Sequence, residues 1–153
     1  MNVESMGTRP EVLLIEDNPS DARLTLEAFK LTKHATDLTV APDALEALAI
    51  LRRQGKHSAS RRPDLILLDL NLPKKDGRDF LAEVKGDPFL RCIPVIVLTG
   101  SSSKHDVLKS YDLHANCYVV KPVDLDEFAA TIEALGDFWL TIARLPERPE
   151  HGR

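Results

Sequence analysis

Short apolar runs alternate along the chain with longer segments in which apolar residues recur every three or four positions. The runs cover residues 12–15, 38–40, 65–68, 94–98 and 118–120. Continuous apolar runs of this length are typical of strands that helices cover on both faces, and the three-and-four spacing is typical of amphipathic helices. The pattern therefore predicts five strands that alternate with helices.

Helix signals stand between these runs. Strands that alternate with helices of this length form a parallel sheet joined by right-handed crossovers, with helices on both faces. The predicted fold class is therefore α/β. The helices are expected to open at Pro19-Ser20-Asp21, at Pro42-Asp43, near Lys104 with Ser102 or Ser103 as cap, and near Asp124, and Pro146 is expected to end the last.

Length and composition suit one compact domain, because 43% of the 153 residues are hydrophobic and 29% are charged. We expect this domain to span residues 11–145, with a flexible segment at 1–10 and a disordered tail at 146–153. A net charge of -4 gives no basic field for DNA binding. Neither a signal peptide nor a membrane span is apparent, and Cys92 and Cys117 are expected to be buried free thiols. These features indicate a cytoplasmic protein.

Polar residues follow four of the five apolar runs. Glu16 and Asp17 follow the first run, Asp69 follows the third, and Thr99 and Lys121 follow the fourth and fifth. Ligands of open parallel sheets bind outside the carboxyl ends of the strands, so these side chains are expected to surround one acidic pocket. A hard divalent cation relieves the repulsion between crowded carboxylates through oxygen coordination. We therefore expect a Mg²⁺ site.

The same pocket suits the transfer of a phosphoryl group to a carboxylate. Asp69 follows the apolar run 65–68, which is expected to be the central strand, and is therefore the expected nucleophile, whereas Glu16 and Asp17 can share the metal. Lys121 can pair with phosphoryl oxygens, and Thr99 can donate a hydrogen bond to one of them. Taken singly, an acidic pair is often a solvated turn and a lysine is often an exposed side chain. Their common placement at strand ends favours a site.

Four motifs occur in order at these strand ends: IEDN at 15–18, LDLNLP at 68–73, LTGS at 98–101 and VKP at 120–122. With them the chain resembles the response-regulator receiver family over about residues 11–142. The resemblance implies a flavodoxin-like, doubly wound (βα)5 fold with strand order 2-1-3-4-5. It also implies that Asp17 and Asp69 ligate Mg²⁺ directly, that Glu16 acts through water, that the Asn71 backbone carbonyl completes the protein ligands, and that Asp69 is phosphorylated.

The resemblance also implies a switch. A phosphoryl group on Asp69 would pull Thr99 towards it, and the Tyr118 ring would then turn inward, so that a partner reads the fourth helix, fifth strand and fifth helix. Tyr118 could instead be a core aromatic with its hydroxyl at the surface. By the same resemblance, Asp76-Gly77 forms a turn whose glycine permits an unusual backbone conformation, and the Lys121-Pro122 peptide is cis.

Residues 110–118, 121–126 and 138–140 resemble the phytochrome-associated subfamily of stand-alone receivers. This implies phosphorylation by a bacterial phytochrome histidine kinase, with output through protein contact or onward phosphotransfer to a downstream protein. Phe138, Trp139 and Leu140 place large apolar groups on adjacent faces of one helix. We expect a homodimer through the last helix, and packing by the tail after Pro146 is the alternative.

The leading interpretation is a signalling switch that assists its own phosphorylation and dephosphorylation and is not a metabolic enzyme. A magnesium-dependent phosphohydrolase with an aspartyl-phosphate intermediate is one alternative. However, Asn71 stands where an acid for leaving-group protonation would be expected. The other alternative is an unphosphorylated dimeric adaptor, which would not require the full set of site residues.

Overall fold

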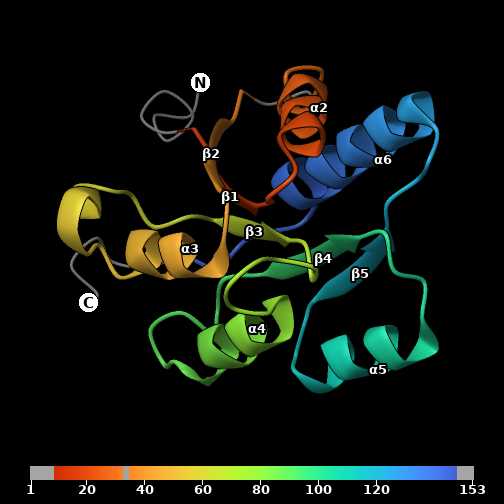
Figure 1. Ribbon diagram of the computed structural model, residues 1–153. Coiled ribbons are helices and arrows are strands. Elements are labelled where there is room, and N and C mark those ends of the chain that lie inside the picture. Colours follow the sequence, from red (N-terminus) through yellow and green to blue (C-terminus); the bar gives the residue numbers. More distant parts are fainter. Residues whose placement is uncertain (1–8, 33–34, 148–153) are drawn as a thin grey trace.

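Five parallel strands form one sheet with helices on both faces (Figure 1), in a computed structural model that describes residues 9–32 and 35–147. The strand order is β2-β1-β3-β4-β5, so the predicted α/β class, flavodoxin-like topology and strand order are confirmed. The strands are β1 (Glu11–Ile15), β2 (Asp37–Ala41), β3 (Leu65–Leu68), β4 (Val95–Thr99) and β5 (Cys117–Val120).

The helices fill the connections between the strands and follow the last one. Among them, no helix of the described residues is long and apolar enough to cross a membrane. They are α2 (Pro19–Phe29), α3 (Ala44–Leu51), a short 3-10 helix (Gly55–His57), α4 (Gly77–Gly86), α5 (Lys104–Asp112), α6 (Leu125–Asp137) and a π-helical turn, η2 (Phe138–Ile142).

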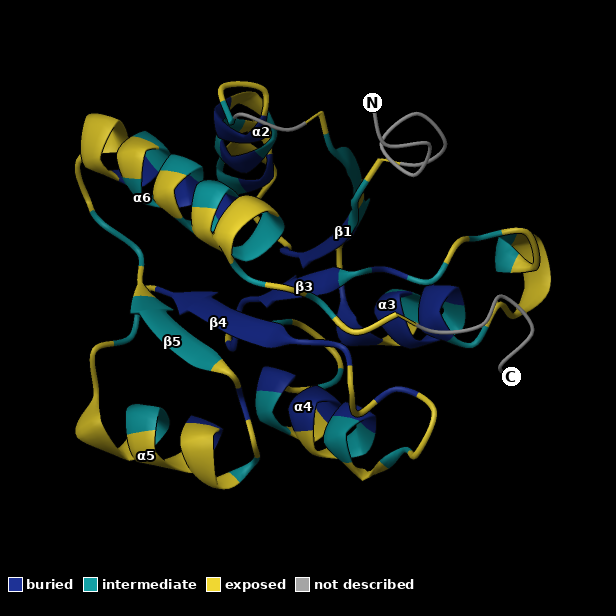
Figure 2. Cartoon of the chain, turned by 180° about the vertical axis from the view of Figure 1, so that it is seen from behind, coloured by how far each residue is buried: buried dark blue, intermediate teal, exposed yellow. Residues whose placement is uncertain are grey.

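Two apolar layers hold the helices on the sheet. Helices α2 and α6 lie on one face, and α3, α4 and α5 lie on the other (Figure 1). Successive residues of β1 show the division, because Val12 and Leu14 pack towards α2 and α6, while Leu13 and Ile15 pack towards α3 and α4. Every residue of β3 and β4 is buried (Figure 2). This arrangement explains why these two runs are continuously apolar.

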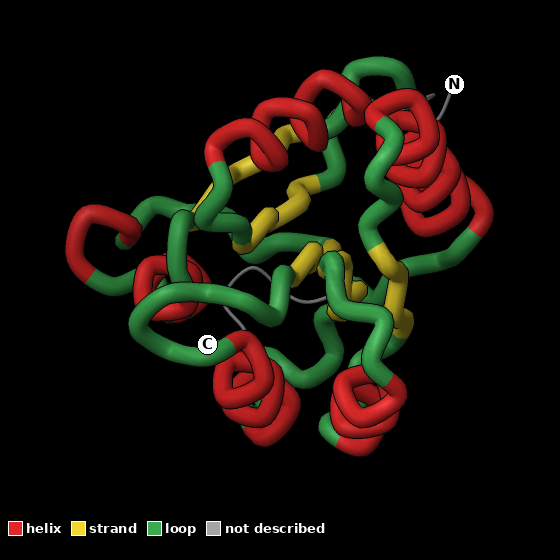
Figure 3. The backbone as a smooth tube through the Cα atoms, turned by 45° about the vertical axis from the view of Figure 1, so that its right-hand side comes forward, coloured by secondary structure: helices red, strands yellow, loops and turns green. Residues whose placement is uncertain are grey.

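The strand register brings the carboxyl ends of the central strands to one level. Ile15 pairs with Leu68, and Leu68 pairs with Val97. The residues that follow β1 and β3, Glu16 and Asp69, therefore leave the sheet side by side. Helices flank the strands on both sides, and loops connect the strand ends to the helices (Figure 3).

Side-chain caps begin four of the helices. Asn18 caps α2 by accepting hydrogen bonds from the amides of Ser20 and Asp21, so the cap lies one residue before the predicted Pro19-Ser20-Asp21. Pro19 occupies the first turn, where its missing N–H costs little. The remaining capping side chains are Asp43 for α3, Asp76 for α4 and Ser103 for α5, the last resolving the choice between Ser102 and Ser103.

The sequence pattern predicts no range for helix α4, which begins at Gly77. Its first residue, Gly77, does not have the left-handed backbone that the predicted turn required; within that loop the positive φ belongs to Lys74, at 66°. A Cβ on Gly77 would instead lie 2.7 Å from the carbonyl oxygen of Asp69 and 2.7 Å from the Cα of Leu70. Gly77 is therefore needed for close backbone approach beside the site.

The last helix also differs from the prediction. The α-helical part ends at Asp137, and the wider turn η2 follows, closed by a hydrogen bond from the Ala143 amide to the Phe138 carbonyl. Ala143 is already extended, with φ -73° and ψ 144°, so the helix ends before Pro146 can act on it. Of the expected tail, 146–153, residues 148–153 lie outside the described residues. Of the expected flexible segment, 1–10, residues 1–8 lie outside them.

Both cysteines are free, but neither is fully buried as predicted. Cys92 is exposed in the turn between α4 and β4, because Leu90 and Ile93 take the two buried positions there. Cys117 is half-buried at the start of β5, an edge strand of the sheet.

Candidate metal centre

Three of the predicted acids lie together at the strand ends. Glu16, Asp17 and Asp69 each offer a carboxylate oxygen, and these oxygens all lie within 4.8 Å of one another. Glu16 and Asp69 are buried, whereas Asp17 faces solvent. Carboxylate oxygens are the hard donors that Mg²⁺ prefers, and an open side allows such an ion to keep several waters. The cluster therefore fits a divalent metal ion.

Asp69 is held by donors on both of its oxygens. Its Oδ1 accepts hydrogen bonds from the Thr99 hydroxyl at 2.9 Å and from the Asn71 amide at 3.1 Å, and its Oδ2 accepts one from Lys121 Nζ at 3.0 Å. Burial acts to raise the pKa of this carboxyl, but the Asn71 amide, Lys121 and Thr99 together lower it. Asp69 is therefore ionised at neutral pH, as a nucleophile must be.

Lys121 is the cation of the site. Its Nζ lies 2.5 Å from Glu16 Oε1, 2.9 Å from Asp21 Oδ2 and 3.0 Å from Asp69 Oδ2. Burial acts to lower the pKa of Lys121, but these carboxylates raise it, so the amine stays charged. Burial raises the pKa of Glu16 to about 7, although Lys121 opposes that shift.

Asp21 was not recognised from the sequence as part of the site. The sequence marks it only as a helix-start residue, and its contact with Lys121 joins positions 100 residues apart. A usable signal was its position one helical turn after Asp17, at the first turn of a helix that starts from the same strand end.

Tyr118 is bonded to the loop that follows Thr99, rather than to the carboxylates themselves. Its hydroxyl donates a 2.8 Å hydrogen bond to the Ser101 carbonyl, two residues after Thr99, and its half-buried ring packs against the α3–α4 core layer. The Ser101 hydroxyl donates to Asp106 at 2.6 Å, and Asp106 also pairs with Arg78 of α4. Tyr118 is therefore neither a simple core aromatic nor free at the surface, because its hydroxyl is bonded to the loop that follows Thr99.

The Lys121-Pro122 peptide is not cis, because the described residues contain no cis peptide bond. The trans peptide still allows Lys121 to reach the acids. Its amide donates a 2.7 Å hydrogen bond to the Thr99 carbonyl, which continues the β4–β5 pairing, and its side chain then extends over the ends of β1 and β3.

Comparison with known proteins identifies the family. The model of the response regulator receiver domain matches residues 12–133. Response regulator Rcp1 of Synechocystis sp. is 47% identical over 135 residues, which cover 88% of this chain and 92% of Rcp1. The probable methanogenesis regulatory protein FilR2 of Methanothrix harundinacea is 37% identical over 137 residues, covering 88% of this chain and 86% of FilR2.

Solved structures agree with this match. The phosphorylated cyanobacterial phytochrome response regulator RcpA has a TM-score of 0.88 and 45% identity, with coverage of 92% of this chain and 100% of that chain. The Mn²⁺-bound form of Rcp1 has a TM-score of 0.87 and 46% identity, covering 90% of this chain and 99% of that chain. A divalent metal ion in so similar a protein agrees with the Glu16, Asp17 and Asp69 cluster, which suits Mg²⁺. The chain belongs to the response-regulator receiver family, a family of phosphoacceptors rather than classical enzymes, and is similar to the phytochrome response regulators within it.

Proposed function

We propose that Asp69 accepts a phosphoryl group from a sensor histidine kinase and that the protein signals by the resulting change of shape. The observation that carries this proposal is the set of side chains around the Asp69 carboxylate. Asp69 has metal-binding acids on one side and the donors Lys121 and Thr99 on the other. Each group has a use in phosphoryl transfer, and a purely structural aspartate would require none of the metal-binding acids.

The residues divide the reaction between them. An Asp69 carboxylate oxygen forms a bond to phosphorus, the P–N bond of the phosphohistidine breaks, and the histidine nitrogen keeps the electron pair. Mg²⁺ would be held directly by Asp17, Asp69 and the Asn71 carbonyl and through water by Glu16, and it would supply positive charge to the phosphoryl oxygens. Lys121 exchanges its Asp69 contact for a phosphoryl oxygen, and Thr99 donates to another.

The signal would travel from Thr99 to the surface. Thr99 ends β4, and the next residues form the loop to which the Tyr118 hydroxyl is bonded. A phosphoryl group that draws the Thr99 hydroxyl would move this loop and the Tyr118 ring together, and would thereby favour one of two arrangements of the α5–β5–α6 face. A partner protein that binds one arrangement better, or a second histidine protein that takes the phosphoryl group, would receive the output.

The donor that we propose is a bacterial phytochrome histidine kinase acting in the cytoplasm. The similarity to RcpA and Rcp1 over nearly the whole chain supports this choice. We also propose that the chain slowly hydrolyses its own aspartyl phosphate. The residue two positions after Asp69 is Asn71, which offers an amide where a phosphohydrolase would need an acid, so slow hydrolysis is expected.

Phosphorylation is tested by intact mass. Incubation with Mg²⁺ and acetyl phosphate should add one phosphoryl group to the wild type and none to Asp69→Asn, because the amide lacks a nucleophilic carboxylate oxygen. Asp76→Asn is a matched control, since Asp76 caps α4 nearby and is not one of the clustered carboxylates; it should be phosphorylated like the wild type. A wild type that gains no adduct with magnesium would refute the proposal and favour the unphosphorylated adaptor.

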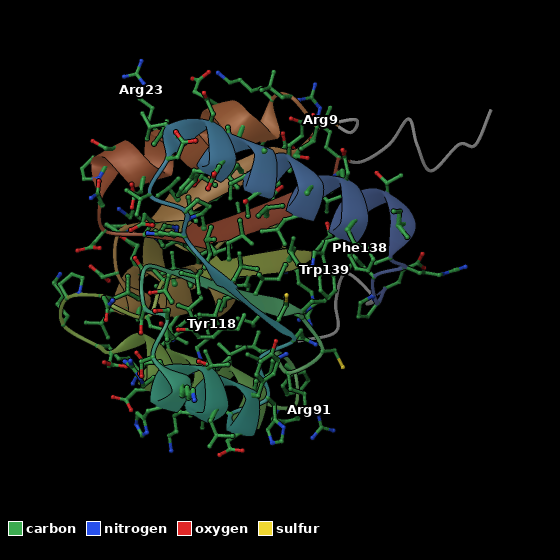
Figure 4. All side chains as sticks on the ribbon, turned by 90° about the vertical axis from the view of Figure 1, so that its right-hand side faces the viewer. Arg9, Arg23, Arg91, Tyr118, Phe138 and Trp139 are labelled. Carbon is green, nitrogen blue, oxygen red and sulfur yellow. The ribbon has the colours of Figure 1, made fainter. Side chains whose placement is uncertain are left out.

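We further propose that a second copy of the chain packs on η2 and the end of α6. Phe138 is 48% exposed and Ile142 is 74% exposed, while Trp139 and Leu140 are partly covered by the core layer under α6. Phe138 and Trp139 lie side by side with ring centroids 5.5 Å apart, well away from Tyr118 (Figure 4). They border a shallow apolar hollow of about 370 Å³. An apolar surface of this kind suits a self-complementary interface.

Phe138→Glu should convert the dimer to a monomer, because an unpaired charge would enter an apolar interface. Sedimentation equilibrium at several protein concentrations measures the change. Leu108→Glu is the matched control, since Leu108 is 64% exposed on α5 and lies outside this surface. A wild type that remains monomeric, or a dimer lost through Leu108→Glu alone, would contradict the interface.

A further inference from the structure

Lys121 has one partner that belongs neither to the metal cluster nor to the acceptor. Among the residues that the structure describes, three carboxylates contact Lys121, and those of Glu16 and Asp69 belong to the group of oxygens that fits a metal ion. The third, Asp21 Oδ2 at 2.9 Å from Nζ, lies on α2 and outside that group. Lys121 therefore bridges the metal cluster and a separate carboxylate.

Asp21 is held rigidly by its helix. It lies in the first turn of α2, its amide donates to the Asn18 cap at 3.2 Å, and its carbonyl accepts a 2.8 Å hydrogen bond from the Thr25 hydroxyl. A carboxylate is favoured at a helix N-terminus by the backbone dipoles. Helix α2 packs against α6, the helix that follows Lys121 in the chain. Thr25, on α2, is buried. The backbone that carries the Asp21 carboxylate is thus held in place, next to Lys121.

The lysine requires such an anchor, because its charge sits at the end of a flexible four-carbon stem with several rotatable bonds. A metal ion and a phosphoryl group would compete with Lys121 for the oxygens of Glu16 and Asp69. Asp21 takes no part in that competition, so its hold on the amine persists through the reaction. Its side chain is only 30% exposed, which limits screening of the pair by solvent.

We propose that Asp21 is a positioning residue that holds the Lys121 ammonium beside Asp69, ready to receive a phosphoryl oxygen. The consequence for the reaction rests on the proposed function, whereas the hold of Asp21 on the amine exists in the metal-free chain and can be measured there. Asp21 lies outside the carboxylate group that fits a metal ion, and its effect would pass through Lys121.

The first test measures the reactivity of the Lys121 amine in EDTA, without any phosphodonor. The protein is acylated with an N-hydroxysuccinimide ester, and the modified Lys121 peptide is quantified by mass spectrometry. Asp21→Ala should increase the acylation rate of Lys121 about threefold by freeing the amine, and Asp21→Asn, which keeps an oxygen acceptor, should increase it less. The control Asp126→Ala alters an exposed acid of α6 and should leave the rate unchanged. An Asp21→Ala rate equal to that of the wild type would overturn the proposal.

The second test measures the rate of phosphorylation by acetyl phosphate with Mg²⁺. Asp21→Ala should slow the appearance of the adduct about tenfold through loss of lysine alignment, and Asp21→Asn should recover more than half of the rate. Recovery by Asn separates positioning from the charge of Asp21, which both variants remove. Equal slowing of both variants, or no slowing of either, would overturn the positioning role. If the wild type gains no adduct at all, the proposed function fails, and the acylation test still decides whether Asp21 holds the amine.

Discussion

Gly77→Ala is expected to lower the free energy of unfolding by about 3 kcal/mol, because a methyl group at this position would overlap the main chain. The added Cβ would lie 2.7 Å from the Asp69 carbonyl oxygen, 2.7 Å from the Leu70 Cα and 2.9 Å from the Leu70 carbonyl oxygen. All three are backbone atoms, so no side-chain rotation relieves the overlap. The loop from β3 to α4 would have to move, and the Gly77 amide would lose its 3.1 Å hydrogen bond to Leu70.

Urea unfolding followed by circular dichroism measures this loss. Gly86→Ala is the matched control, because Gly86 is the last residue of the same helix and an added Cβ would meet no atom within 4 Å. That variant should be unchanged or more stable by about 0.5 kcal/mol, since alanine restricts the unfolded chain. If Gly77→Ala were as stable as Gly86→Ala, the close approach of the loop to α4 would be disproved.

Lys121→Met is expected to cost about 3 kcal/mol of unfolding free energy near neutral pH in EDTA. The variant leaves Glu16 and Asp69, both buried, with Asp21 close by and no cation among them. Methionine has a similar length and apolar stem, so the loss isolates the charge rather than the packing. Addition of Mg²⁺ should recover part of the stability, because the same carboxylates can share the ion.

The pH dependence of this variant has a definite sign. In the wild type the pKa of Glu16 is about 7, above its ordinary 4.5, so the folded chain keeps a proton that the unfolded chain releases. Stability linked to this proton is complete below about pH 4.5 and is lost as the pH rises through about 7. Since Lys121 opposes the rise, its removal should raise the pKa further and deepen the loss. The difference between Lys121→Met and wild type should therefore be larger at about pH 8 than at about pH 5.5.

Lys30→Met is the control for a lysine that pairs only at the surface. Lys30 Nζ lies 3.4 Å from Glu27 Oε1, and both side chains are more than half exposed. Such a pair contributes less than about 1 kcal/mol and should show no comparable dependence on pH. Equal losses in Lys121→Met and Lys30→Met would mean that the strand-end acids do not depend on Lys121.

The sequence alone determined the framework and most of the chemistry. Five apolar runs and the helical spacing between them predicted a parallel sheet, because burial on both faces requires apolar residues at every position of β3 and β4. Once the strands were parallel, the residues after them had to meet at one edge. That geometry predicts that Glu16, Asp69 and Lys121, which follow their strands, lie beside Thr99, which ends β4.

The tertiary structure alone decided the features that depend on how elements lie against one another. Asp21 reaches Lys121 only through the rotation of α2 about its axis, and Gly77 is required by the approach of two backbone segments rather than by its own φ. The chain also leaves α6 through a wider turn before Pro146, which no local pattern predicted. Periodicity reports which residues are buried within one element, whereas contacts between elements depend on register, rotation and packing that are set only when the whole chain folds.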